Sequence, residues 1–92
     1  MADYKEIGDR IRWHRKLLAL TQREYSERAG LERSQLKNWE TGNYRLSLDG
    51  ALALRQTYGL SLDFLICGVS DALPMALRNA WLEGLALGTP NN

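Results

Sequence analysis

The sequence predicts an all-α fold of five or six short helices, and three observations support this prediction. Apolar residues recur at helical spacing along most of the chain, and no useful stretch alternates at the period of two that a strand requires. Capping residues and glycines bracket the periodic stretches where helices begin and end. Two of these stretches, within residues 22–41, are hinged on a single glycine.

The first helix is predicted over residues 6–18. Its apolar stripe consists of Ile7, Ile11 and Leu18. The second helix is predicted over residues 22–29, where Thr21 and Glu24 match a T-x-x-E capping box. Gly30 ends this helix, because glycine adopts the left-handed conformation beyond a helix end most easily.

The third helix is predicted over residues 33–41, directly after that glycine, with Leu36 and Trp39 on its inward side. Two helices joined by so short a turn cannot lie antiparallel, so they cross steeply and leave the second one prominent. Residues 22–41 therefore predict a helix-turn-helix, which places its second helix in the major groove of DNA.

The fourth helix is predicted to follow Ser47 as its cap and to stop at Gly59. Ser61 can cap a short fifth helix over residues 62–67. A loop then leads to a sixth helix over residues 74–87, which opens on a proline, a favoured first helical residue.

The composition is that of one ordinary globular domain: 92 residues, 45% hydrophobic and 25% charged. The single cysteine, Cys67, rules out an internal disulfide and is predicted to be a small core residue. There is neither a secretory apolar region nor an apolar stretch of the roughly 20 residues that a membrane helix needs. We therefore expect a soluble, cytoplasmic protein without a membrane partner.

The charge is unevenly distributed, although the net charge is only +1. Residues 1–45 hold ten Lys and Arg against seven Asp and Glu, which gives +3, and residues 46–92 hold two against four, which gives −2. The basic half contains the helix-turn-helix, as binding to phosphates requires.

The polar face of the third helix is the candidate base-reading surface. It consists of Arg33, Ser34, Lys37 and Asn38, opposite the apolar side. Arg33 can donate two hydrogen bonds to guanine and Asn38 can pair with adenine, so these two are predicted to read bases. Ser34 and Lys37 are predicted to share base and phosphate contacts. The alternative is an ordinary solvated helix face, which every amphipathic helix has.

Residues 7–68 resemble the lambda-repressor-like helix-turn-helix family of Cro/XRE-type regulators. The matching segments are LTQREYSERAG, LERSQLKNWETG and YGLSLDFLICG. The resemblance implies a compact five-helix DNA-binding domain over residues 1–68. Residues 69–92 then form a loop and an additional C-terminal helix, which is a candidate dimerisation element.

The family pattern also implies roles for residues at matching positions. Gln22 corresponds to a position that contacts the DNA backbone at a helix N-terminus, and Asn43 and Arg45 to positions that contact phosphate after the third helix. Arg15 and Glu40 correspond to an ion pair that fixes the orientation of two helices. Ordinary surface charge is the alternative for these positions.

The C-terminal helix carries a small-residue groove beside an apolar ridge. The groove consists of Ala76, Ala80, Gly84 and Gly88, and the ridge of Leu73, Leu77, Trp81 and Leu85. Such a surface lets two helices approach closely. One interpretation is a homodimer, with Leu77, Ala80, Trp81, Gly84 and Leu85 as the candidate contacts. In the other interpretation this helix covers the core of its own domain.

Nothing in the sequence predicts an enzyme, a metal site or a cofactor. His14 has no second histidine or cysteine at metal-ligand spacing, and no nucleophile, base and orienting group can be assembled.

Tyr25 departs from the family pattern and must direct its hydroxyl to water or to a partner. Trp13, Trp39 and Trp81 are predicted to pack rather than to stack on bases.

Taken together, these observations predict a sequence-specific regulator of transcription that binds double-stranded DNA. The expected mode is a repressor that binds an inverted-repeat operator as a dimer. The alternative is an antitoxin-like module that docks a partner protein and can also repress its own operon.

Overall fold

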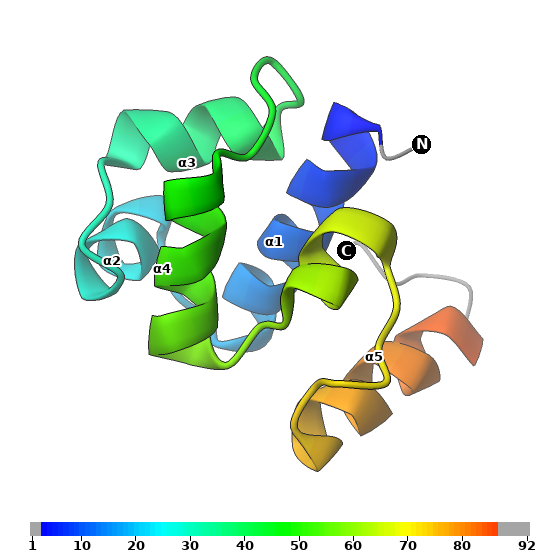
Figure 1. Ribbon diagram of the computed structural model, residues 1–92. Coiled ribbons are helices and arrows are strands. Elements are labelled where there is room, and N and C mark those ends of the chain that lie inside the picture. The colour runs from blue at the N-terminus through cyan, green and yellow to red at the C-terminus, as the bar shows by residue number, and fades with distance from the viewer. Residues whose placement is uncertain (1–2, 87–92) are drawn as a thin grey trace.

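The computed structural model describes residues 3–86, and within that range the chain is all-α with no strand (Figure 1). Its helices are α1 (Tyr4–Leu17), α2 (Gln22–Arg28), α3 (Arg33–Glu40), α4 (Leu48–Tyr58), η1 (Asp63–Cys67) and α5 (Met75–Ala86). The predicted fold class is confirmed, and each predicted helix agrees with an observed one to within two residues at either end. Leu87 and Gly88, which belonged to the predicted C-terminal helix and its groove, lie outside the described residues.

The predicted helix boundaries follow from local chemistry. The Thr21 hydroxyl accepts a hydrogen bond from the Glu24 N–H at 3.1 Å, and the Glu24 carboxylate accepts one from the Thr21 N–H at 3.0 Å. The bond from the Thr21 N–H lowers the pKa of the Glu24 carboxyl. Gly30 and Gly59 adopt φ angles of 68° and 74°, so both helices end at a left-handed glycine.

The fifth helix differs from its prediction, because η1 is a π-helix rather than a turn of α-helix. Ser61 does cap it, since its hydroxyl accepts from the Phe64 N–H at 3.2 Å. The other end is held by Arg10 of α1, which donates to the carbonyls of Leu65 and Ile66 at 3.1 Å each. Arg10 is buried, and burial lowers the pKa of its guanidinium. A long-range donor thus satisfies carbonyls that a helix end leaves free.

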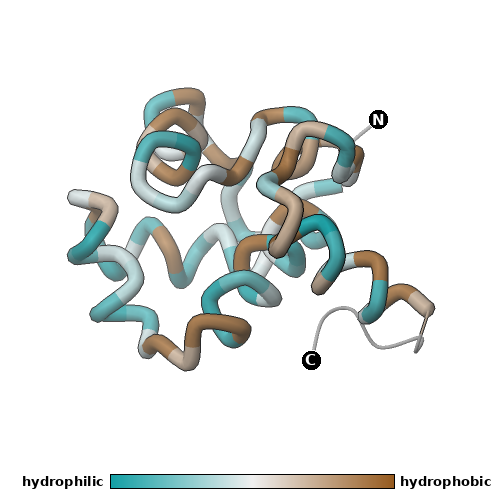
Figure 2. The backbone as a smooth tube through the Cα atoms, turned by 90° about the horizontal axis from the view of Figure 1, so that it is seen from below, coloured by the Kyte–Doolittle hydropathy of each residue, from teal (hydrophilic) through white to brown (hydrophobic). Residues whose placement is uncertain are grey.

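The core is built around α1, against which both α3 and η1 pack (Figure 1). Along the chain, apolar segments alternate with hydrophilic ones, as expected of helices with one buried side (Figure 2). The completely buried apolar side chains are Ile11, Tyr25, Leu36, Leu54, Leu60, Phe64 and Leu65.

Two glycines allow α3 to lie unusually close to its neighbours. A Cβ atom on Gly8 of α1 would lie 1.9 Å from the carbonyl oxygen of Trp39, and one on Gly50 of α4 would lie 2.4 Å from the Trp39 ring. Trp39 is therefore enclosed between two helices at positions where no larger residue fits. This packing holds the side of α3 that carries Trp39 against the core and leaves the opposite side exposed to solvent.

Helix α5 packs on the core through Trp81, whose ring lies 5.0 Å from both the Trp13 and the Phe64 ring. Leu77 and Ala80 are partly buried beside it. The structure thus assigns Trp81 to the domain's own core, because this edge-to-face cluster removes it from the outer surface. Leu85 is 48% exposed. All three tryptophans are packing residues, as predicted.

The prediction that Cys67 is a core residue is wrong, because its side chain is exposed. The inward positions of η1 are occupied by Phe64 and Leu65, and Cys67 lies at the helix end, next to the left-handed Gly68. An apolar run in the sequence did not reveal which of its residues turns outward.

Candidate nucleic-acid interface

Helix α3 presents the predicted polar face to solvent. Arg33, Ser34 and Lys37 are exposed and Asn38 is half-buried, whereas Leu36 and Trp39 are buried on the opposite side. At the start of the helix, the Gln35 amide oxygen accepts from the Glu32 N–H at 2.9 Å, which satisfies one free backbone donor. The four predicted base-reading residues therefore share one side of a helix whose back is fixed by packing.

The turn between α2 and α3 is held by the backbone. The Leu31 N–H donates to the Ser26 carbonyl at 2.8 Å, and the buried Ser26 hydroxyl donates to the Arg23 carbonyl at 3.0 Å. Ser26 is small enough to lie at this crossing point. The Leu31 bond thus closes the C-terminal end of α2, and the Ser26 hydroxyl bond lies within α2.

A buried aromatic cluster fastens α2 to α1 and α4. His14 Nδ1 and the Tyr25 hydroxyl share a hydrogen bond of 2.7 Å, and the Tyr58 hydroxyl donates to the Tyr25 carbonyl at 2.7 Å. The Tyr25 and Tyr58 rings stack with their centroids 4.3 Å apart. Burial lowers the pKa of His14 to about 4 and raises the pKa of Tyr25, so both groups are neutral at pH 7. The Tyr25 hydroxyl, for which the sequence indicated no particular partner, is thus hydrogen-bonded to His14.

A polar network joins α1, α2 and α3 beneath the exposed surface. The Arg15 guanidinium donates two hydrogen bonds to the Glu40 carboxylate, at 2.8 and 2.9 Å, and a third to the Leu20 carbonyl at 3.0 Å. The Gln22 amide donates to the same carboxylate at 3.2 Å. The hydrogen bonds that Arg15 donates to Glu40 raise the pKa of Arg15. Gln22, at the first position of α2, is therefore oriented by Glu40.

The segment after α3 carries the other two predicted phosphate-binding residues. The Asn38 carbonyl accepts from the N–H groups of Asn43 and Tyr44, at 3.0 and 3.2 Å, which closes the end of the helix. Asn43 and Arg45 have exposed side chains, and the Arg45 guanidinium lies 6.0 Å from the centre of the Tyr4 ring. Both residues lie in the loop that follows α3, the helix predicted to read bases.

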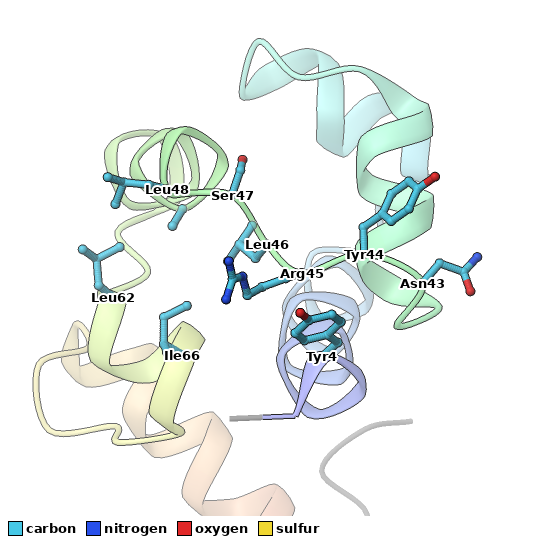
Figure 3. A pocket seen from close by; sticks show the side chains of 10 residues that line it. Tyr4, Asn43, Tyr44, Arg45, Leu46, Ser47, Leu48, Leu62 and Ile66 are labelled. Carbon is cyan, nitrogen blue, oxygen red and sulfur yellow. The ribbon is translucent and has the colours of Figure 1, made fainter. Parts of the chain in front are cut away.

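Arg45 also borders a groove of about 650 Å³ between the start of α1, the α3–α4 loop, the start of α4 and η1. Leu62 and Ile66 lie across this groove from Tyr4 and Arg45 (Figure 3). Leu48, at the first position of α4, is 69% exposed at its edge. The groove is lined mainly by apolar groups, so it is better suited to packing against another apolar surface than to reading bases.

Two smaller hollows meet at Gln22 and Arg15, and both are lined with arginine. One is lined by Arg15, Thr21, Gln22, Arg23 and Arg33, and the other by Arg12, Arg15, Gln22, Glu40 and Thr41. Sequence reasoning missed Arg12 and Arg23 as candidates. The signal was present for Arg12, since it precedes Arg15 by three residues and therefore lies on the same side of α1.

Other kinds of site are not evident in residues 3–86. No group of three or more His, Cys, Asp or Glu side chains could hold a metal ion there. None of the helices in this range combines the length and the apolarity needed to cross a membrane.

Comparison with known families agrees with this geometry. A family model described as helix-turn-helix matches residues 11–65, which is more than half of the chain. The chain belongs to the lambda-repressor-like helix-turn-helix family. This family comprises DNA-binding regulators and is not typically enzymatic, so the chain is a DNA-binding transcriptional regulator in general terms. No curated protein and no solved structure matched the chain.

Within the helix-turn-helix family match lie α2, α3 and α4 in full, together with most of η1 and the second half of α1. The match includes every residue predicted to contact DNA. Helix α5 lies outside it, so family membership carries no information on what α5 does.

Proposed function

We propose that this helix-turn-helix protein is a repressor that binds an inverted-repeat operator sequence-specifically as a dimer. The observation that carries the proposal is the polar face of α3, which is exposed, while the residues behind it are held by Gly8, Gly50 and Trp39. A rigid helix with outward donors suits direct readout in the major groove.

In this proposal Arg33 and Asn38 read base edges, and Ser34 and Lys37 share base and phosphate contacts. Gln22, Asn43 and Arg45 bind the DNA backbone on either side of α3. The Arg15–Glu40 pair acts through orientation, because it connects α1 to α3 and holds the Gln22 amide. Phosphate contacts fix the position of the domain on the duplex, and base contacts give specificity.

The dimer is proposed to form through the outer side of α5, with the surface of α4 and η1 as a second area of contact. Residues 1–68 then carry DNA binding, and residues 69–92 carry association. Leu85 is exposed, Leu77, Ala80 and Gly84 are partly buried, and Trp81 supports the helix from within. A two-fold dimer would place two copies of α3 about 34 Å apart, one turn of the duplex.

The proposal is tested by selecting bound duplexes from a random DNA library at about 150 mM salt, where non-specific phosphate binding is suppressed. The expected result is an inverted repeat with half-sites one turn apart. Recovery of no consensus would contradict sequence-specific binding, and a single unrepeated half-site would contradict the dimer. Repression is tested by placing the recovered site over a promoter and measuring reporter output with and without the protein.

A second candidate function is an antitoxin-like role in which the chain docks a partner protein. It is favoured by the apolar side chains that α5 leaves exposed, among which Met75 is 78% and Leu82 40% exposed. The two functions are compatible, since a DNA-bound antitoxin can repress its own operon. Co-purification of a stoichiometric second chain that is lost on Leu82→Glu substitution would favour this role.

A further inference from the structure

The smaller arginine-lined hollow, of about 270 Å³, lies where α1 meets α2 and α3 and is lined by Arg12, Arg15, Gln22, Glu40 and Thr41. It contains two arginines, of which Arg15 is paired within the described residues and Arg12 is not. Arg15 is bound by Glu40 and by the Leu20 carbonyl, so its charge and its donors are largely used within the protein. Arg12 is exposed and has no ion pair or hydrogen bond with any residue of the described range.

The acidic group in this hollow does not oppose the binding of an anion. The Glu40 side chain is only 3% exposed, and its oxygens accept two hydrogen bonds from Arg15 and one from Gln22. Its negative charge is therefore balanced inside the protein. The hydroxyl of Thr41 donates to backbone carbonyls of α3, which leaves it with no proton to offer an anion.

Net positive charge thus remains at the open side of the hollow, and Arg12 is its source. Gln22 lies beside it and has a second amide hydrogen besides the one donated to Glu40. A guanidinium with free donors next to an amide N–H matches a phosphate oxygen pair in charge and in hydrogen bonding.

We propose that Arg12 is a phosphate-binding residue and that the DNA-contacting surface of this protein extends from the helix-turn-helix onto α1. The ligand is a backbone phosphate of double-stranded DNA, held by Arg12 and Gln22 over the neutralised Arg15–Glu40 pair. The inference rests on the proposed DNA binding and adds to it a contact outside α2 and α3.

The experiment measures how DNA affinity depends on salt between about 50 and 200 mM, with a duplex of mixed sequence as the probe, because non-specific binding reports phosphate contacts. Arg12→Ala should weaken binding and reduce the slope of log K against log salt by about 0.9, the value for one phosphate contact. Arg12→Lys keeps the charge and should retain most of that slope.

The matched control is Lys16→Ala, since Lys16 is an exposed cation one turn further along α1 that does not line the hollow. It removes the same charge and should leave the slope near that of the wild type. Equal slopes for Arg12→Ala and the wild type would overturn the inference, and so would equal losses for Arg12→Ala and Lys16→Ala. If the wild-type protein itself fails to bind duplex DNA, the proposed function fails and the inference falls with it, and this outcome is distinct from the other two.

Discussion

Arg33 opens α3 with an exposed side chain that makes no ion pair within the described residues. Arg33→Ala should weaken binding to the selected operator by about 1–3 kcal/mol and relax the preference at one base position, because a bidentate arginine discriminates guanine from other bases. Affinity for unrelated duplexes should change less. Repeating the library selection with the variant measures both effects.

The control for Arg33 is Arg55→Ala, which removes an exposed arginine from α4, away from the reading face. It should leave the consensus unchanged. An Arg33→Ala protein that selects the same consensus as the wild type would show that the reading face has been assigned to the wrong residues.

The buried His14 side chain changes its charge in a moderately acidic range. Its pKa is lowered from 6.5 to about 4 in the folded protein, so the unfolded chain takes up the proton first as the pH falls. The stability contributed by neutral His14 is complete above about pH 6.5 and should decline by up to about 3 kcal/mol as the pH falls to about 4. Urea unfolding at a series of pH values measures this decline.

The comparison for His14 is His14→Asn, which keeps a polar group near the Tyr25 hydroxyl but has no titrating ring. This variant should lose less stability between pH 6.5 and 4 than the wild type does. Parallel loss in the two proteins over that range would assign the pH dependence to other groups.

At the scale of elements, two of the contacts between α1 and α3 can be tested separately, and one of them is the Arg15–Glu40 pair. Arg15→Ala would leave the nearly buried Glu40 carboxylate without its cation, which should lower the free energy of unfolding by about 3–5 kcal/mol. The double variant Arg15→Met, Glu40→Met leaves no unpaired charge and should be the more stable of the two. If the double variant is the less stable in urea unfolding, the pair stabilises the fold through more than charge compensation.

The other contact is the close approach at Gly8. Gly8→Ala would place a methyl group against the Trp39 carbonyl, so α1 and α3 must separate, at a cost of about 1–3 kcal/mol. Arg12→Ala, on the exposed side of the same helix, is the control and should stay within about 0.5 kcal/mol of the wild type. A Gly8→Ala protein as stable in urea as the wild type would show that the crossing tolerates a wider spacing.

Features that depend on residues close together in the chain could be predicted from the sequence, whereas features that depend on distant residues could not. The starts of α2 and α4 and the glycine ends of α2 and α4 depend on groups within a few residues, so they were predictable. The way in which the end of η1 is held was not predictable, because the donor to the Leu65 carbonyl is Arg10, 55 residues away in the chain. The exposure of Cys67 and the closeness of Arg12 to Gln22 likewise depend on how helices pack, which spacing along one helix does not reveal.

Across the whole molecule, charge and apolar surface are separated. The half that contains the helix-turn-helix carries a charge of +3, whereas the half from residue 46 onward carries −2 and includes the exposed apolar side chains of α5. Helix α5 holds one arginine and one glutamate and adds no net charge, so it is not part of the basic surface that is proposed to bind phosphates. A dimer formed through α5 could therefore present both reading helices to the same duplex without repulsion between DNA and its own contact surface.

That arrangement is tested by Leu85→Glu, which puts a charge on the outer side of α5, where Leu85 is 48% exposed and the core is left intact. Light scattering should show a dimer for the wild type and a monomer for the variant, because burying an unpaired carboxylate opposes association. Binding to an inverted repeat should weaken and lose its dependence on half-site spacing, while binding to a single half-site stays unchanged. Val69→Glu, which charges an exposed residue of the preceding loop, is the control. A Leu85→Glu protein that remains dimeric would move the contact surface away from α5 and toward the groove bordered by Leu48.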